Sequence, residues 1–216
     1  MGKSLIGRGL RVEVSKTIGA AKTVSAISNA DPGVATSAEH GMAAGIVGFF
    51  DEVSGMANID GQAARVHAPD TDSFTLQGLN TTNFPAFTGG KFLPVTVWST
   101  LSQSTSYQIG GGDANKLKTT TLLDDIEQEE NGLLAAQTVS IELNHETVDP
   151  EALTLINTAA LEQEYLVFRI TFKDGGQRIF RGQPSMPGEN TSQGGLATGS
   201  ISVTVKGRVL RLPAVA

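Results

Sequence analysis

Residues 165–181 read YLVFRITFKDGGQRIFR, and this stretch decides the fold class. Phe168, Ile170 and Phe172 stand at alternate positions, which is the period of a β-strand with one buried face. The Asp-Gly-Gly triplet at 174–176 is a tight-turn signal, and strand-forming residues resume after it. The stretch therefore predicts a β-hairpin.

The same alternation recurs along the chain. Residues 10–14, 137–143 and 200–212 place aliphatic residues at every second position, and Gly207 is expected to mark a bulge. Pro94 argues for an edge position of its strand. Shorter β-like runs are fenced by Gly, Asn, Asp or Pro, at 23–28, 34–36, 46–50, 63–67, 74–76 and 92–98. These patterns predict an all-β (mainly) fold.

One helix interrupts the strands, at about 150–163. Asp149-Pro150-Glu151 combines a capping residue, a proline at the first helical position and an acid in the first turn. Ala152, Ile156 and Ala159 follow at helical spacing and form an apolar stripe.

The most polar part of the chain lies before residue 137. Residues 99–118 are expected to form a long loop, because they are rich in Ser and Thr and contain the triplet Gly110-Gly111-Gly112. The loops 103–121 and 182–199 are expected to be mobile in the free subunit and ordered on assembly. An acidic cluster follows, made of Asp124, Asp125, Glu127, Glu129 and Glu130.

Composition excludes several classes of protein. The 216 residues carry a net charge of −6 and scattered Lys and Arg, whereas a nucleic-acid-binding protein needs a basic face. The absence of cysteine removes disulfide scaffolds, thiolate zinc sites and cysteine nucleophiles. No apolar run approaches a membrane span or a signal peptide. We expect a soluble protein without a membrane anchor, made in a cytoplasm.

No residue pattern assembles a catalytic, cofactor-binding or metal site. His40, His67 and His145 lack the short spacing of paired ligands, and no nucleophile elbow occurs. The glycine triplet lacks the remainder of a phosphate-loop motif. The acidic cluster lacks the alternate carboxylates and central glycine of a calcium loop. We therefore expect no enzyme activity, no cofactor and no metal.

The long alternating strands raise the question of their edges. An unblocked strand edge pairs with another chain. If the rotation between copies closes, rings result, and head-to-tail contacts extend them into a filament. Self-assembly is thus the function that the residues themselves favour.

Several segments resemble the tail tube proteins of phages with long non-contractile tails. The likeness is carried by residues 2–9, 121–125, 130–133, 177–182 and 199–207. Segments between them resemble a small β module found in several phage structural proteins, namely residues 31–36, 40–41, 54–56, 58–61, 74–76 and 88–90.

This resemblance implies a division of the chain. Residues 1–20 and 91–216 would form a tail-tube β-sandwich or barrel with the flanking helix, and residues 21–90 an inserted small β module. Relatives form hexameric rings whose sheets join into one barrel, and the rings stack into a tube that conducts DNA. The implied location is the virion tail tube, with the host cytoplasm as the place of assembly.

The resemblance also implies partners. They are other copies of the chain, other tail proteins at the tube ends, and DNA that passes without sequence-specific binding. The segment 103–135 would reach the neighbouring ring or the rim of the lumen. Asp124, Asp125, Glu127, Glu129 and Glu130 would then repel DNA or dock onto Lys and Arg of the next ring.

Two other interpretations stay open at this point. A virion β-sandwich binding module, for host adhesion or carbohydrate, requires clustered exposed aromatic residues, but Trp98, Tyr107 and Tyr165 lie far apart in the sequence. A tube of a contractile machine would share the same fold.

Overall fold

The computed structural model describes residues 9–146 and 150–215, and it confirms a mainly β fold with one α-helix. The elements in chain order are β1 (Arg11–Ile18), β2 (Lys22–Val24), β3 (Ala26–Ile27), β4 (Val34–Thr36), β5 (Val47–Ser54), the short 3-10 helix η1 (Ala57–Ile59), β6 (Ala63–His67), β7 (Ser73–Leu76), β8 (Gly89–Thr100), β9 (Ser104–Gly111), β10 (Ala114–Lys118), β11 (Glu129–Leu134), β12 (Gln137–Asn144), α1 (Glu151–Glu162), β13 (Leu166–Thr171), β14 (Gln177–Pro184) and β15 (Thr198–Leu212). No helix within these residues has the length and apolar character to cross a bilayer.

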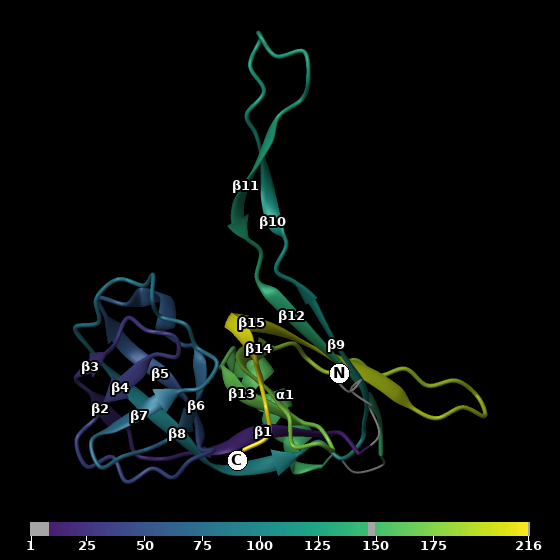
Figure 1. Cartoon of the computed structure of the whole chain (residues 1–216). Helices are drawn as coiled ribbons and strands as arrows, with labels where there is room; N and C mark the ends of the chain where they lie inside the picture. The colour runs from purple at the N-terminus through teal and green to yellow at the C-terminus, as the bar shows by residue number, and fades with distance from the viewer. Residues whose placement is uncertain (1–8, 147–149, 216) are drawn as a thin grey trace.

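Thirteen strands form one curled sheet, and β10 and β11 form a second sheet of two strands (Figure 1). The order in the large sheet is β3-β4-β7-β6-β5-β8-β1-β13-β14-β15-β12-β9, with β2 beside β8. Strands β2 to β7 gather at one end of this sheet, while β1, β9 and β12 to β15 form the other end with α1 (Figure 1).

Strand β8 connects the two ends of the sheet, and this corrects the prediction that Pro94 lies on an edge. The first half of β8 pairs with β5 and β2, and the second half pairs with β1. Pro94 is opposite Gly48 of β5, and the next residue, Val95, already pairs with Ile18 of β1. The Pro94 carbonyl accepts a hydrogen bond from Gly19 N–H at 2.7 Å. A proline is tolerated inside the sheet because it stands where β8 exchanges one partner for another.

Two hydrophobic clusters lie on opposite faces of the same strands. Val167, Ile179 and Leu210 point to one face of β13–β15 and join the cluster built mainly by residues 24–95. Phe168, Ile170 and Phe180 point to the other face and join the cluster that contains α1. The middle of the sheet is therefore covered on both faces.

Helix α1 matches the predicted range of about 150–163. Its buried residues are Ala152, Leu153, Ile156 and Ala159, which confirms the apolar stripe. Asp149, the predicted cap, lies outside the described residues, and Pro150 occupies the N-cap position with extended backbone. Gln163 ends the helix in the left-handed conformation, with φ 57°.

The predicted hairpin and bulge are confirmed. Gly175 adopts φ +82° between β13 and β14, and Asp174 Oδ1 accepts the Gly176 N–H at 3.0 Å. Four residue steps on β15 oppose two on β14 around Gly207, which has φ +83°.

The prediction of a long loop over 99–118 is wrong. Residues 104–111 form β9, which pairs with β12 along most of its length, and residues 114–118 form β10. Only Tyr107 and Ile109 of β9 pack against the core, because β9 is the outermost strand. The remaining positions of β9 are mostly serine and glycine, so the strand shows too little alternation of apolar and polar residues to be recognised from the sequence.

Candidate assembly surfaces

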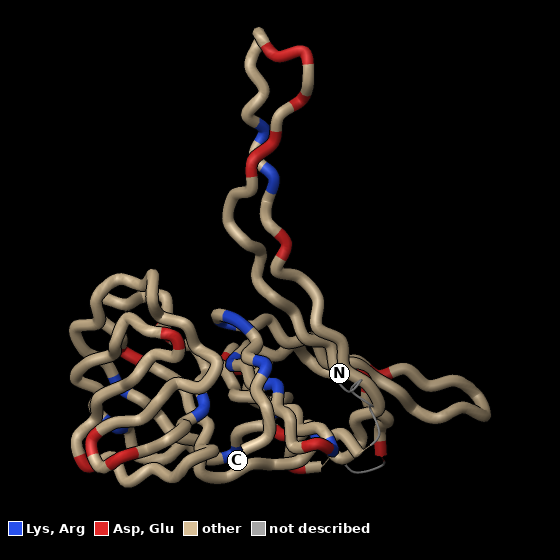
Figure 2. Tube along the Cα trace, in the orientation of Figure 1, with Lys and Arg blue, Asp and Glu red and all other residues tan. Residues whose placement is uncertain are grey.

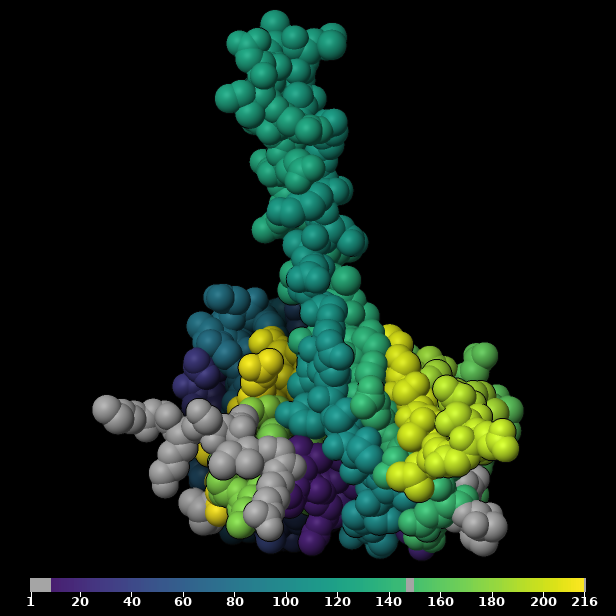
Figure 3. Space-filling model, turned by 90° about the vertical axis from the view of Figure 1, so that its right-hand side faces the viewer, coloured from purple at the N-terminus to yellow at the C-terminus, as the bar shows by residue number. Residues whose placement is uncertain are grey.

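The dominant surface feature is a two-stranded projection, which we call the arm (residues 112–135). Strands β10 and β11 pair through Ala114↔Leu134, Leu117↔Glu130 and Lys118↔Glu129. The arm rises from the base formed by β9 and β12 and stands clear of the body, as Figures 1 and 3 show. Gly111 and Gly112 adopt φ +73° and +86° at its root, where the chain turns out of the large sheet.

The arm carries apolar side chains that its own chain does not cover. Leu122 is fully exposed and Leu133 is 84% exposed. The other exposed large aliphatic residues of the arm are Leu117, Leu123, Ile126 and Leu134. An apolar group of this kind on a soluble protein marks a surface that a partner buries.

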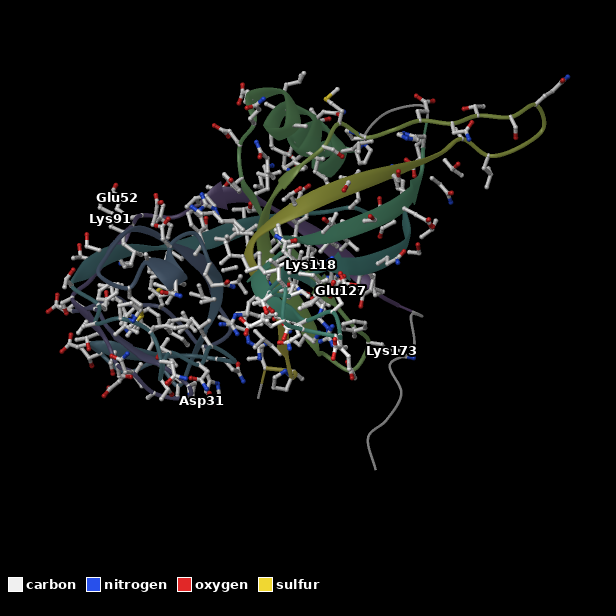
Figure 4. All side chains as sticks on the ribbon, turned by 90° about the horizontal axis from the view of Figure 1, so that it is seen from above. Asp31, Glu52, Lys91, Lys118, Glu127 and Lys173 are labelled. Atoms are coloured by element: carbon white, nitrogen blue, oxygen red, sulfur yellow. The ribbon has the colours of Figure 1, made fainter. Side chains whose placement is uncertain are left out.

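All five acidic candidates lie in the outer half of the arm (Figure 2). Asp124 Oδ2 accepts hydrogen bonds from the Thr121 N–H at 2.7 Å and from the Thr121 hydroxyl at 2.8 Å. The backbone bond, and next the hydroxyl bond, hold the pKa of Asp124 below its usual value. Glu127 pairs with Lys118 across the arm (Figure 4). Glu129 and Glu130 belong to β11, and for Asp125 no ion pair occurs with any described residue.

Charge is distributed unevenly over the chain. The arm contains six carboxylates and two lysines, a net charge of −4. Residues 21–90 contain seven carboxylates and two basic residues, a net charge of −5. The remainder of the chain is therefore +3, because the whole chain is −6. The arm is thus opposite in sign to the part of the chain outside both segments, residues 1–20, 91–111 and 136–216.

One long edge of the large sheet is open. Strand β9 pairs with β12 on one side, and no described strand pairs with it on the other. Every second backbone N–H and C=O of an edge strand points away from its single partner. The edge of β9 can therefore accept a strand from another chain.

The sheet next to this edge has a face of neutral polar residues. In antiparallel pairs, residues directly opposite each other share a face. Thr138 is opposite Thr204, and Ser140 is opposite Ser202 and Gln108. Glu142 is the one carboxylate in this register, and it accepts a hydrogen bond from the Ser106 hydroxyl at 2.8 Å. Figure 3 views the part of the molecule where β9, β12 and β15 lie side by side.

A second extension joins β14 to β15. Ser185 N–H donates to Ser202 O at 2.7 Å and Gly188 N–H donates to Ser200 O at 3.0 Å, so part of the predicted loop 182–199 continues the ladder. Met186 and Leu196 are exposed there.

His40, His145 and the glycine triplet at 110–112, which the sequence offered as candidate site residues, make contacts that belong to the fold. His40 is buried against Phe74, and its Nδ1 accepts the Met42 N–H at 3.0 Å. His145 Nε2 lies 3.1 Å from Gly188 O. Gly110 and Gly111 pair with β12, so the glycine triplet begins inside a strand. No group of three metal-ligating side chains occurs in the described parts of the chain.

Sequence reasoning missed two components of these surfaces. The leucines of the arm could not be recognised as exposed, because apolar residues in a sequence are normally interpreted as part of the core. Basic residues that looked scattered are brought together by strand register: Arg178 stands directly opposite Arg211. Only the pairing of β14 with β15 reveals that proximity.

A family model described as "Phage tail tube protein, TTP" matches residues 54–214, which is most of the chain. No curated protein matches the chain in sequence.

Proposed function

The chain belongs to the phage tail tube protein family, and from this premise we propose how its surfaces build the tube. The family gives the chain a structural role in the virion tail, by polymerisation into a tube, and not an enzymatic one. The sequence-based predictions of family, tail tube role and absence of catalysis are thereby confirmed. The manner of polymerisation is our proposal.

Copies join side by side into a ring through the open edge of β9. The facing edge in the next copy is the outer side of residues 183–190, which extend β14 beyond the end of β13. Pro184 and Pro187 lack N–H groups, so at these two positions the segment 183–190 offers only carbonyl oxygens, to which the N–H groups of β9 can donate. Each copy would then contribute four neighbouring strands to the wall of the ring, β14, β15, β12 and β9. The expected ring is a hexamer.

The neutral face of β9, β12 and β15 lines the lumen. Hydroxyl and amide groups such as those of Ser140, Ser202 and Thr204 offer DNA no fixed cation. A wall without positive charge does not retain the phosphate backbone through counterion release. This supports passage of DNA without sequence-specific binding.

The arm connects successive rings. The observation that carries this assignment is the set of exposed aliphatic side chains, above all Leu122, on a projection that its own body does not support. The five acidic residues serve this contact rather than the lumen rim. Other tail proteins meet the tube at its ends, where one set of arms has no next ring, and assembly takes place in the host cytoplasm before the tail is complete.

Residues 21–90 form an inserted module, and residues 1–20 and 91–216 form the tube domain. The support is that most of the first hydrophobic cluster belongs to 24–95, and that Lys22 pairs with Phe92, so the segment leaves and re-enters the tube domain at neighbouring positions.

Electron microscopy of the purified chain tests the proposed function. We expect concentrated protein to form tubes with a stacked-ring repeat. The matched control replaces residues 113–135 by a two-residue Asn-Gly turn, which joins β9 to β12 as a hairpin. This variant should fold, form at most single rings and fail to form tubes. Tubes of normal length from the armless variant would show that ring stacking does not require the arm.

A further inference from the structure

A basic patch lies at the end of the sheet where β13, β14 and β15 meet. Arg178 of β14 and Arg211 of β15 are direct cross-strand partners. Like charges in that position destabilise a sheet. Lys173 lies at the adjoining hairpin turn and is exposed, as is Arg211, while Arg178 is half-buried. We call these three residues the hairpin patch.

The hairpin patch has no internal counter-charge among the described residues. None of its three cations forms an ion pair there, although the chain contains such pairs elsewhere, for example Lys206–Asp60. Asp174, the adjacent carboxylate, accepts the Gly176 N–H within the turn. Arg178 donates to the Gln177 carbonyl at 3.1 Å, and its guanidinium lies 5.0 Å from the centroid of the Phe172 ring. The Arg178 side chain is thus held in place without an anionic partner, so the patch can bind a carboxylate from another chain.

The arm tip is the complementary surface on the same chain. The tip, residues 119–130, contains five carboxylates and no Lys or Arg, and Asp125, Glu129 and Glu130 have no ion-pair partner within the described residues. The arm's two lysines contact their own arm: Lys118 pairs with Glu127 and Lys116 donates to Asn131.

The two surfaces lie at opposite ends of the subunit. The C-terminal end of β15 descends to the side of the body away from the arm tip (Figure 1). The turn of the hairpin patch is at that same end, because a Cβ on Gly175 would stand 2.8 Å from Ala214. A contact between tip and patch is therefore head-to-tail, which propagates along an axis and does not close on itself in a pair.

The geometry points to the hairpin patch as the receptor for the arm of the copy in the adjacent ring. The acidic tip, residues 119–130, docks on Lys173, Arg178 and Arg211, and the exposed leucines of the arm are buried alongside. The inference rests on the proposed ring stacking and names the surface that it uses. Opposite charge steers this encounter and fixes its register, so assembly should weaken as salt rises.

Charge reversal and charge exchange test the docking. Arg178→Glu with Arg211→Glu should raise the protein concentration needed for tube formation at least about tenfold, measured by sedimentation and electron microscopy. Asp125→Lys with Glu130→Lys should do the same. The chain carrying all four substitutions should recover assembly, because tip and patch are again opposite in sign. Lys22→Glu reverses a cation of β2 that forms no ion pair among the described residues; it is the control and should assemble normally.

A disulfide experiment reports on proximity even if a reversal variant folds poorly. The natural chain has no cysteine. Asp125→Cys and Arg211→Cys chains, mixed and oxidised, should yield a covalent dimer only under polymerising conditions. The control pairs Asp125→Cys with Asp31→Cys, on the acidic surface of residues 21–90, and should give none (Figure 4). Tubes of the mixed Asp125→Cys and Arg211→Cys chains without this disulfide, or normal tubes from the Arg178/Arg211 reversal, would overturn the inference, whereas failure of the wild type to polymerise would overturn the proposed function itself.

Discussion

The side-chain amide of Gln62 exchanges two hydrogen bonds with the backbone of Arg208, 146 residues away. Gln62 Nε2 donates to Arg208 O at 3.0 Å, and Arg208 N–H donates to Gln62 Oε1 at 2.9 Å. The contact occurs at the bulge of β15, because Gly207 withdraws that backbone from the β14 ladder. The bulge is therefore the place where residues 21–90 are fixed on the long C-terminal strand.

A side chain at the bulge should disrupt this attachment. A Cβ on Gly207 would stand 2.1 Å from Gln62 Oε1, and its φ of +83° disfavours any other residue. We expect Gly207→Ala to lower the free energy of unfolding by about 2 kcal/mol or more, since both strain and the lost bonds contribute. Gly110→Ala, which meets no atom within 4 Å, is the matched control and should change stability little. Urea unfolding curves measure both, and equal values would contradict this account.

Arg65 supplies a second attachment and is completely buried. Its guanidinium donates to Gln77 Oε1 at 2.6 and 2.9 Å, to Gln177 Oε1 at 2.9 Å and to Pro213 O at 2.7 Å. Burial lowers the pKa of Arg65, because no carboxylate among the described residues offsets the desolvation. Arg65→Met should still destabilise the fold by about 2–4 kcal/mol, since buried acceptors lose their donors.

Limited proteolysis and thermal unfolding test the Arg65 prediction. The variant should be cleaved faster between residues 19 and 22 or near 213, where residues 21–90 meet the tube domain. Lys173→Met removes an exposed cation and should stay within about 0.5 kcal/mol of the wild type. An Arg65→Met chain as stable as this control would show that the buried network contributes nothing.

The order of the arm tip should depend on pH through Asp124. The hydrogen bonds from Thr121 lower its folded pKa relative to the unfolded chain, so they stabilise the tip above the unfolded value of about 4. That stabilisation is lost as the pH falls through the folded pKa. Amide exchange at Thr121, followed by NMR, should accelerate relative to the body in acid. Asp124→Asn should abolish this difference between high and low pH.

Removing the apolar side chains of the tip should separate folding from assembly. Leu122 and Leu123 make almost no contact with their own chain, since both are exposed over more than nine-tenths of their surface. Leu122→Ser with Leu123→Ser should leave the melting temperature unchanged within about 1 °C. Tube formation should require a several-fold higher concentration. A lowered melting temperature would mean that these residues pack within the monomer.

Positive charge on the neutral face should affect DNA passage. Ser202→Lys adds a cation to the proposed lumen wall, and Ser202→Asn adds bulk without charge. We expect both to form tubes, but phage with the lysine variant should release DNA more slowly, with relief at high salt, because each phosphate contact is salt-sensitive. Equal release from the two variants would place this face outside the lumen.

The sequence predicted those parts of the fold in which one residue alternation decides one element. The hairpin at 165–181, the strand at 200–212 and the helix stripe at Ala152 and Ile156 all depend on local periodicity. Strand β9 was missed because an edge strand needs few apolar residues, and Pro94 was misplaced because its setting depends on where β8 changes neighbours. The acidic residues were recognised as a cluster, but their position on a free-standing hairpin follows from pairing between β10 and β11 that no local pattern encodes.

The sharing of β8 limits how this subunit can be reshaped. Topologically, residues 21–90 are simple to excise, since the chain departs and returns through adjacent strands, β2 and β8. Yet Val167, Ile179, Leu210 and Leu212 pack in one hydrophobic cluster with residues 24–95, and excision would expose these four side chains to water in every copy. Replacing residues 21–90 by another domain that covers the same four side chains should therefore be tolerated better than deleting them. A protein fused at this position should keep the apolar residues that contact β13–β15 and vary only the outer loops.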